Sequence, residues 1–96
     1  AQYDINSLSR LDEKKSLQIL NYLYDSLNNK KFMLDHWKSE MISWGKQEGF
    51  SAKEIMQTIR MALVGSLKGP DLVSISSFIG EDAFLKRLNS FIEFIK

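Results

Sequence analysis

The chain contains no cysteine, one histidine and one proline among its 96 residues. Without cysteine it can form neither a disulfide nor a thiolate metal site, and a single histidine, His36, leaves few ordinary metal ligands. We therefore expect no metal site and no cofactor held by this chain. The lack of cysteine also fits a reducing compartment, and we expect a cytoplasmic protein.

Long apolar runs and a substantial net charge are also missing. The apolar runs span only a few residues, far short of the ~20 that a membrane helix needs. No charged-then-apolar leader opens the chain, so we expect neither a membrane span nor a signal peptide. The chain has thirteen Lys and Arg and twelve Asp and Glu, which gives a formal net charge of +1. A protein that holds duplex DNA through its phosphates is normally more basic, so any nucleic-acid contact must be local or shared with parts of a larger protein.

The apolar residues recur at spacings of three and four, which is the period of amphipathic helices. We expect a single compact all-α domain of five helices without strands, with a flexible or extended lead-in over residues 1–8. The expected helices cover about residues 12–28, 32–48, 51–64, 70–79 and 81–95. Ser51 and Glu54 have the spacing of a capping box, Gly65 is expected to end the third helix, and Pro70 is expected in the first turn of the fourth.

No pattern of residues indicates catalysis. A serine nucleophile needs a base within reach, and His36, the one ordinary candidate, lies off the apolar stripe and is expected at the surface. Glu81 and Asp82 are adjacent carboxylates, but they open a helix, where negative charge is favourable. Trp37 and Trp44 could stack on bases, but their seven-residue spacing puts both on one helix face, which favours a core role.

Arg60 stands out because it lies at the margin of an apolar helix face, where its stem can pack while its guanidinium emerges. Ten residues later comes the single proline, Pro70, directly after Gly69. Two interpretations remain open at this point. The arginine either pairs with a carboxylate such as Asp71, or it faces a ligand beside the glycine–proline loop.

The loop that contains Gly69 and Pro70 has little side-chain bulk, so its backbone could approach a flat ligand closely. Lys68 contributes a positive charge to it, Ser66 a hydroxyl, and Leu72 an apolar side chain. An arginine fork, bare backbone groups and an apolar residue together suit an unstacked base, which is how proteins read single-stranded RNA loops.

The stretch R-x-A-L-x-G-S-x-x-G-P-x-L, from Arg60 to Leu72, resembles the anticodon-binding C-terminal region of bacterial-type glutamyl-tRNA synthetases. GFSAKEIMQTIRMAL before it and IGEDAFLKRL after it are also similar to that family. The likeness covers about residues 49–91 well, and residues 12–48 only by helix pattern and order.

The resemblance implies a helix-cage packing and recognition of the anticodon loop of a glutamate tRNA. Carried over position by position, the family's base contacts correspond to Arg60, Gly69, Pro70 and Leu72. Ser66 and Lys68 lie in the same loop and are placed near RNA on physical grounds alone. The family usually has threonine where this chain has Val64, so a hydroxyl is lost just before the loop.

The chain lacks the family's catalytic "HIGH"-like and "KMSKS"-like motifs. The resemblance therefore implies a non-catalytic C-terminal part of a longer, monomeric ligase that attaches glutamate to tRNA. ATP and Mg would be cofactors of that parent enzyme, and its preceding helical and catalytic domains would be partners of this one. Two alternatives stay open: a helical protein-interaction domain without RNA binding, in which an exposed Phe94 would face the partner, and the equivalent domain of a class I lysyl-tRNA synthetase.

Overall fold

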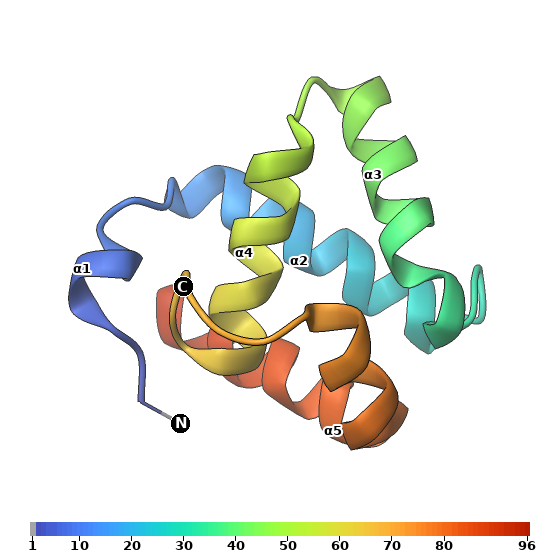
Figure 1. The fold of residues 1–96 in the computed structure, drawn as a ribbon. Helices are drawn as coiled ribbons and strands as arrows, with labels where there is room; N and C mark the ends of the chain where they lie inside the picture. The colour runs from blue at the N-terminus through green and yellow to red at the C-terminus, as the bar shows by residue number, and fades with distance from the viewer. Residues whose placement is uncertain (1) are drawn as a thin grey trace.

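The molecule is built from helices over residues 2–96, the part of the chain that the computed structural model describes. No strand forms within this range, so the expected all-α five-helix class is confirmed. In Figure 1, α4 passes in front of α2, α3 stands to one side, and α5 lies below them. The elements are α1 (Ile5–Leu8), α2 (Glu13–Asn28), the 3-10 helix η1 (Leu34–His36), α3 (Trp37–Glu48), α4 (Ala52–Val64) and α5 (Leu72–Ile95).

Local capping signals fix the ends of α4. The Ser51 hydroxyl accepts the Glu54 backbone N–H at 3.1 Å, and the Glu54 carboxylate accepts the Ser51 backbone N–H at 3.0 Å. The expected capping box is therefore formed, and its hydrogen bonds hold the pKa of Glu54 below the ordinary value. Gly65 ends the helix in the left-handed region at φ 76°, as expected.

Pro70 lies outside the helix that follows it, so its expected place in the first helical turn is wrong. α5 begins at Leu72, because the Asp71 carboxylate accepts the Ser74 backbone N–H at 2.9 Å and makes Asp71 the N-cap. The proline therefore belongs to the loop and shapes the approach to the helix.

Two further boundaries differ from expectation. The helices expected over residues 70–79 and 81–95 are the two arms of α5, which meet at Gly80, where φ 82° and ψ 170° are not helical. The helix expected from residue 32 opens instead with the turn η1, and α3 starts only at Trp37. Met33, which precedes η1, is 53% exposed.

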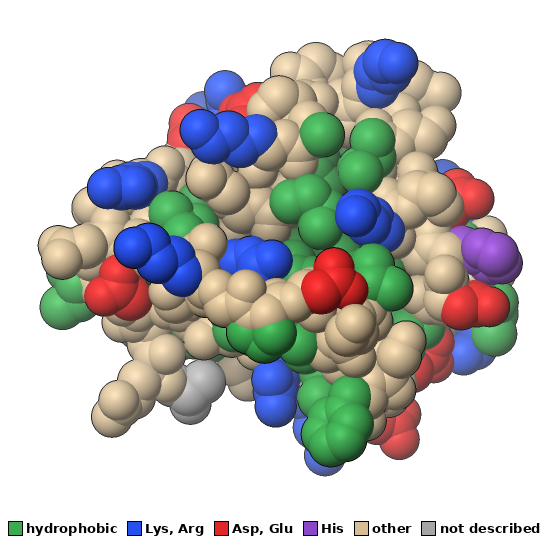
Figure 2. Space-filling model, viewed as in Figure 1, with side chains coloured by type: hydrophobic (Ala, Val, Ile, Leu, Met, Phe, Trp, Pro, Cys, Tyr) green, Lys and Arg blue, Asp and Glu red, His purple; other side chains and the backbone are tan. Residues whose placement is uncertain are grey.

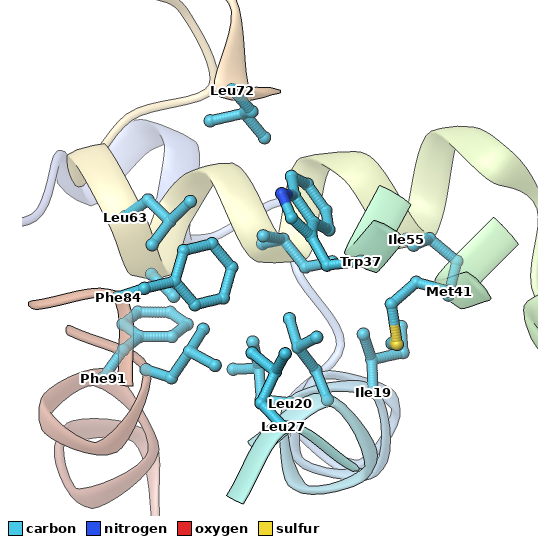
Figure 3. Close-up of a cluster of buried hydrophobic side chains, with 14 of the residues drawn as sticks. Ile19, Leu20, Leu27, Trp37, Met41, Ile55, Leu63, Leu72, Phe84 and Phe91 are labelled. Carbon is cyan, nitrogen blue, oxygen red and sulfur yellow. The ribbon is translucent and has the colours of Figure 1, made fainter. Parts of the chain in front are cut away.

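The core lies where α2, α4 and α5 meet the first turns of α3 (Figure 3). Trp37 is 1% exposed and donates its Nε1–H to the Ser76 hydroxyl at 2.9 Å, so its expected core role is confirmed. Trp44 is half-buried and stacks on Tyr22 with ring centroids 4.3 Å apart. The largest fully buried side chains are Trp37, Phe84, Phe91, Ile19, Leu20, Leu23, Leu27, Met41, Ile55, Ile59, Met61 and Leu72.

The start of the chain is bonded to the loop that follows α4. The expected extended lead-in is helical over Ile5–Leu8, the element α1. The Asp4 backbone N–H donates to the Gly65 carbonyl at 2.7 Å, and the Leu67 backbone N–H donates to the Ser7 hydroxyl at 3.3 Å. These two bonds join segments about sixty residues apart, which no local pattern could predict.

Tyr3 adds an aromatic contact at the same end of the molecule. Its ring lies 4.9 Å from that of Phe91 and 4.8 Å from that of Phe94, measured between centroids. Burial in this cluster raises the pKa of the Tyr3 hydroxyl. Phe94 remains 56% exposed, so it forms the outer edge of the cluster.

We expect Gly65→Ala to release the N-terminal segment from the loop. A Cβ at this position would collide with the Gln2 carbonyl oxygen, in addition to the strain of φ 76°. Gly49→Ala is the matched control, because Gly49 has φ 88° and no atom within 4 Å of an added Cβ. Both variants should lose about 1 kcal/mol to the left-handed backbone. Amide hydrogen exchange at Asp4 and Leu67 should accelerate in Gly65→Ala alone; equal protection in both variants would contradict the collision.

Gly45→Ala should destabilise the fold although alanine normally favours a helix. Gly45 is buried in α3, and an added Cβ would lie 2.8 Å from Cγ1 of Ile55 on α4. Overpacking of this kind costs about 1–3 kcal/mol, whereas the gain in helix propensity is about 1 kcal/mol. Ser43→Ala, at an exposed position of the same helix, should be neutral or slightly stabilising. Urea unfolding measures both, and a Gly45→Ala variant as stable as Ser43→Ala would refute the tight packing.

Candidate nucleic-acid interface

The loop between α4 and α5, residues 65–71, exposes its middle while its ends are fixed. Gly65 is buried at the end of α4, and Asp71 caps α5. Between them Lys68, Gly69 and Pro70 are exposed. A bare stretch of backbone is therefore held at the surface between two anchored points.

Arg60 reaches this exposed stretch from the preceding helix. Its side chain is half-buried, and its Nη1 donates to the Pro70 carbonyl at 2.8 Å. An added Cβ on Gly69, whose φ is 147°, would lie 3.4 Å from that same nitrogen. A guanidinium has five N–H donors, and this is its one hydrogen bond within residues 2–96. Donors are therefore left for a ligand beside the loop.

Asp71 does not form the ion pair with Arg60 that the sequence left open. Its carboxylate accepts the Ser74 backbone N–H at 2.9 Å and the Ser74 hydroxyl at 3.1 Å. These bonds lower the pKa of Asp71, and the positive charges of Lys38 and Arg60 lower it further. Because the carboxylate serves the helix cap, the guanidinium bonds the loop backbone.

The remaining expected contacts divide between surface and core. The Ser66 hydroxyl accepts the Lys68 backbone N–H at 3.2 Å, and the Lys68 side chain is exposed. Leu72 is 1% exposed and points into the core near Leu63 and Trp37 (Figure 3). Its side chain thus anchors the start of α5 and has no exposed surface for RNA. The structure brings Arg60, Gly69 and Pro70 into direct contact, with Lys68 and Ser66 beside them.

Arg87 supports the loop from α5, and sequence reasoning assigned it no role. Its Nη1 donates to the Leu63 carbonyl at 2.9 Å. The last carbonyls of a helix have no partner within it, so this bond stabilises the end of α4 just before the loop. Bonding to a distant carbonyl leaves no periodic trace in a sequence. The position of Arg87 in the matched segment IGEDAFLKRL was the one available signal.

The residues considered for catalysis make ordinary surface contacts. His36 is exposed, and its Nε2 lies 3.8 Å from a carboxylate oxygen of Asp35. Glu81 pairs with Lys30 at 3.0 Å. Within residues 2–96 no three His, Asp or Glu side chains are grouped so that they could hold a metal ion. Of the helices that the structure describes, none has the length and hydrophobicity of a transmembrane span.

Comparisons with known proteins agree with the motif. Residues 1–92 match the family described as an anticodon binding domain. A glutamate–tRNA ligase of Christiangramia forsetii is 36% identical over 77 residues, which are 80% of this chain and 15% of that protein. The glutamate–tRNA ligase of Bacillus licheniformis is 28% identical over 93 residues, 96% of this chain and 19% of that protein. That of Bacteroides thetaiotaomicron is 25% identical over 97 residues, 100% of this chain and 19% of that protein. No solved structure matches.

The chain spans less than a fifth of the length of these relatives. The matches confirm the resemblance seen in the segment from Arg60 to Leu72, and they lend no support to a protein-interaction domain without RNA binding or to a lysyl-tRNA synthetase domain. Because the family model matches residues 1–92, almost the whole sequence, this all-helical chain belongs to the family of anticodon-binding domains.

Proposed function

We propose that this domain recognises the anticodon loop of a glutamate tRNA as a non-catalytic part of a glutamate–tRNA ligase. The observation that carries the proposal is the exposed bend at Gly69 and Pro70, with the Arg60 guanidinium bonded to its backbone. A bare backbone and an arginine with donors to spare are what an unpaired base needs for hydrogen bonding and close approach.

The bond to Pro70 gives Arg60 its part in recognition. One Nη1–H holds the loop, and the remaining donors of the guanidinium face the edge of a base. Gly69 lets a base lie close to the loop because it has no side chain there. A well-placed bidentate arginine contact is worth about 1–3 kcal/mol of base discrimination in DNA, and the same scale is expected for RNA.

The chemistry of aminoacylation belongs to the rest of the longer protein. There ATP and Mg would serve to activate glutamate, and the preceding helical and catalytic domains would act on the acceptor end of the tRNA. This domain contributes position and discrimination, in a monomeric enzyme of the cytoplasm. The relatives named above carry the name of that ligase and are more than five times as long as the stretch that they share with this chain.

The near-neutral charge of the domain predicts weak binding when it is alone. With a formal net charge of +1, it can neutralise few phosphates. We expect its dissociation constant for glutamate tRNA to be at least roughly tenfold higher than that of a longer protein with the preceding helical domain, which adds phosphate contacts. Fluorescence anisotropy at one salt concentration measures both. Equal affinity would place all of the binding energy in this domain and contradict the division proposed.

Arg60→Ala should weaken binding to the cognate anticodon stem-loop more than to a stem-loop with altered anticodon bases. Arg60→Lys is the matched variant, since lysine keeps the charge but lacks the planar fork. Arg60→Lys should bind the altered stem-loop with the affinity of the wild type. Its preference for the cognate over the altered stem-loop should fall by about tenfold or more, within the 1–3 kcal/mol range above. A uniform loss over both RNAs in Arg60→Ala, with full discrimination in Arg60→Lys, would reduce Arg60 to a phosphate contact. Amide shifts of residues 71–74 report whether the loop keeps its place.

A further inference from the structure

A groove of about 370 Å³, lined mostly by polar residues, lies between α1 and the loop after α4. Arg10 and Lys68 line it together with Asp4, Asn6 and Ser66. Of the proposed RNA contacts, Ser66 and Lys68 border this groove. Its other wall is the N-terminal segment, which has no role in the function proposed above. Figure 2 shows Lys and Arg side chains gathered on the side of the view where α1 lies.

The groove has an excess of positive charge. Arg10 and Lys68 are both exposed and lie near the Asp4 carboxylate, whose pKa is lowered mainly by its hydrogen bonds from Ser7 and further by these two positive charges. That carboxylate is already engaged, because it accepts the Ser7 backbone N–H at 2.8 Å and the Ser7 hydroxyl at 2.6 Å. Within residues 2–96 neither cationic side chain has a hydrogen bond or an ion pair. Two cations without partners thus face one carboxylate that is committed to α1.

The two walls of the groove are fixed relative to each other. The Leu67 backbone N–H donates to the Ser7 hydroxyl, and the Asp4 backbone N–H donates to the Gly65 carbonyl. On the α1 side, the Arg10 backbone N–H donates to the Ser7 carbonyl at 3.1 Å. The backbones that carry Arg10 and Lys68 are therefore held in place before any ligand arrives, which reduces the entropy lost on binding.

From this arrangement we propose that the groove binds a backbone phosphate of the RNA whose base lies at Arg60. The inference rests on the proposed function and extends it to a second wall of the interface. A phosphodiester is the anion that single-stranded RNA presents next to every base, and charge-assisted hydrogen bonds from arginine and lysine are its usual partners. The loop is shared by both contacts: its Gly69–Pro70 bend serves the base, and its Ser66–Lys68 part serves the phosphate.

Arg10→Gln, Lys68→Gln and the double variant test this inference through the salt dependence of binding. With the anticodon stem-loop as the probe, each single variant should bind about threefold more weakly at low salt. The double variant should bind more weakly still and reduce the slope of log K against log salt by about 0.7–0.9, the value for one phosphate. The loss should be equal for cognate and altered anticodons, because phosphate contacts carry no sequence information. Lys46→Gln, an exposed lysine in the last turn of α3, is the matched control and should leave affinity and slope unchanged.

Each outcome separates the groove from the proposed function. If the wild type binds the stem-loop and the groove variants match Lys46→Gln in affinity and slope, the groove is not a phosphate site although the function stands. If the variants lose binding only for the cognate anticodon, Lys68 and Arg10 read bases, and the phosphate assignment fails. If the wild type binds no stem-loop even at low salt, both the proposed function and the phosphate site in the groove are contradicted. Saturation of the amide shifts of residues 66–68 by submillimolar inorganic phosphate without RNA would mark a free-anion site and overturn the inference.

Discussion

A hydrogen bond between the Arg60 guanidinium and the Pro70 carbonyl ties an exposed loop to the helix that precedes it. This bond can fix the conformation of the loop because other contacts hold both of its ends. Arg87 bonds the Leu63 carbonyl at the end of α4, and Leu72 is buried in the core at the start of α5. Little freedom remains in the seven residues between these helices, so a ligand that meets the loop finds it already in shape.

Local chemistry made much of this arrangement predictable. The capping box of Ser51 and Glu54 and the left-handed Gly65 are signals within one turn of the chain, and both formed as expected. The break between the two arms of α5 at Gly80 could also be predicted, because glycine tolerates a conformation that would strain other residues. Pro70 was misplaced because proline at a helix start and Asp71 as an N-cap are competing local signals, and the hydrogen bond of the cap prevailed.

The parts that the sequence could not supply all involve distant partners. Arg60 and Arg87 both bond backbone carbonyls, and a carbonyl is present at every residue, so no spacing of side chains points to the acceptor. α1 is a single turn whose position depends on its bonds to the loop rather than on an apolar stripe. Val64 also meets the loop in a way that its sequence position does not indicate: its Cγ2 would lie 3.9 Å from a Cβ on Gly69.

The two cations of the groove explain why a phosphate would lie on the α1 side of the loop. A helix start normally favours an anion, since its backbone N–H groups are unpaired. At the start of α5 the Asp71 carboxylate already accepts the Ser74 N–H, so a phosphate there would find that donor occupied. Asp4 accepts the equivalent bonds from Ser7 in α1, but two cations, Arg10 and Lys68, lie around it. Lys38 and Arg60 also lie near Asp71, but the Arg60 guanidinium is bonded to the Pro70 carbonyl. Arg10 and Lys68 instead line one groove together and have no partner within residues 2–96, so a phosphate on the α1 side could contact two cations at once.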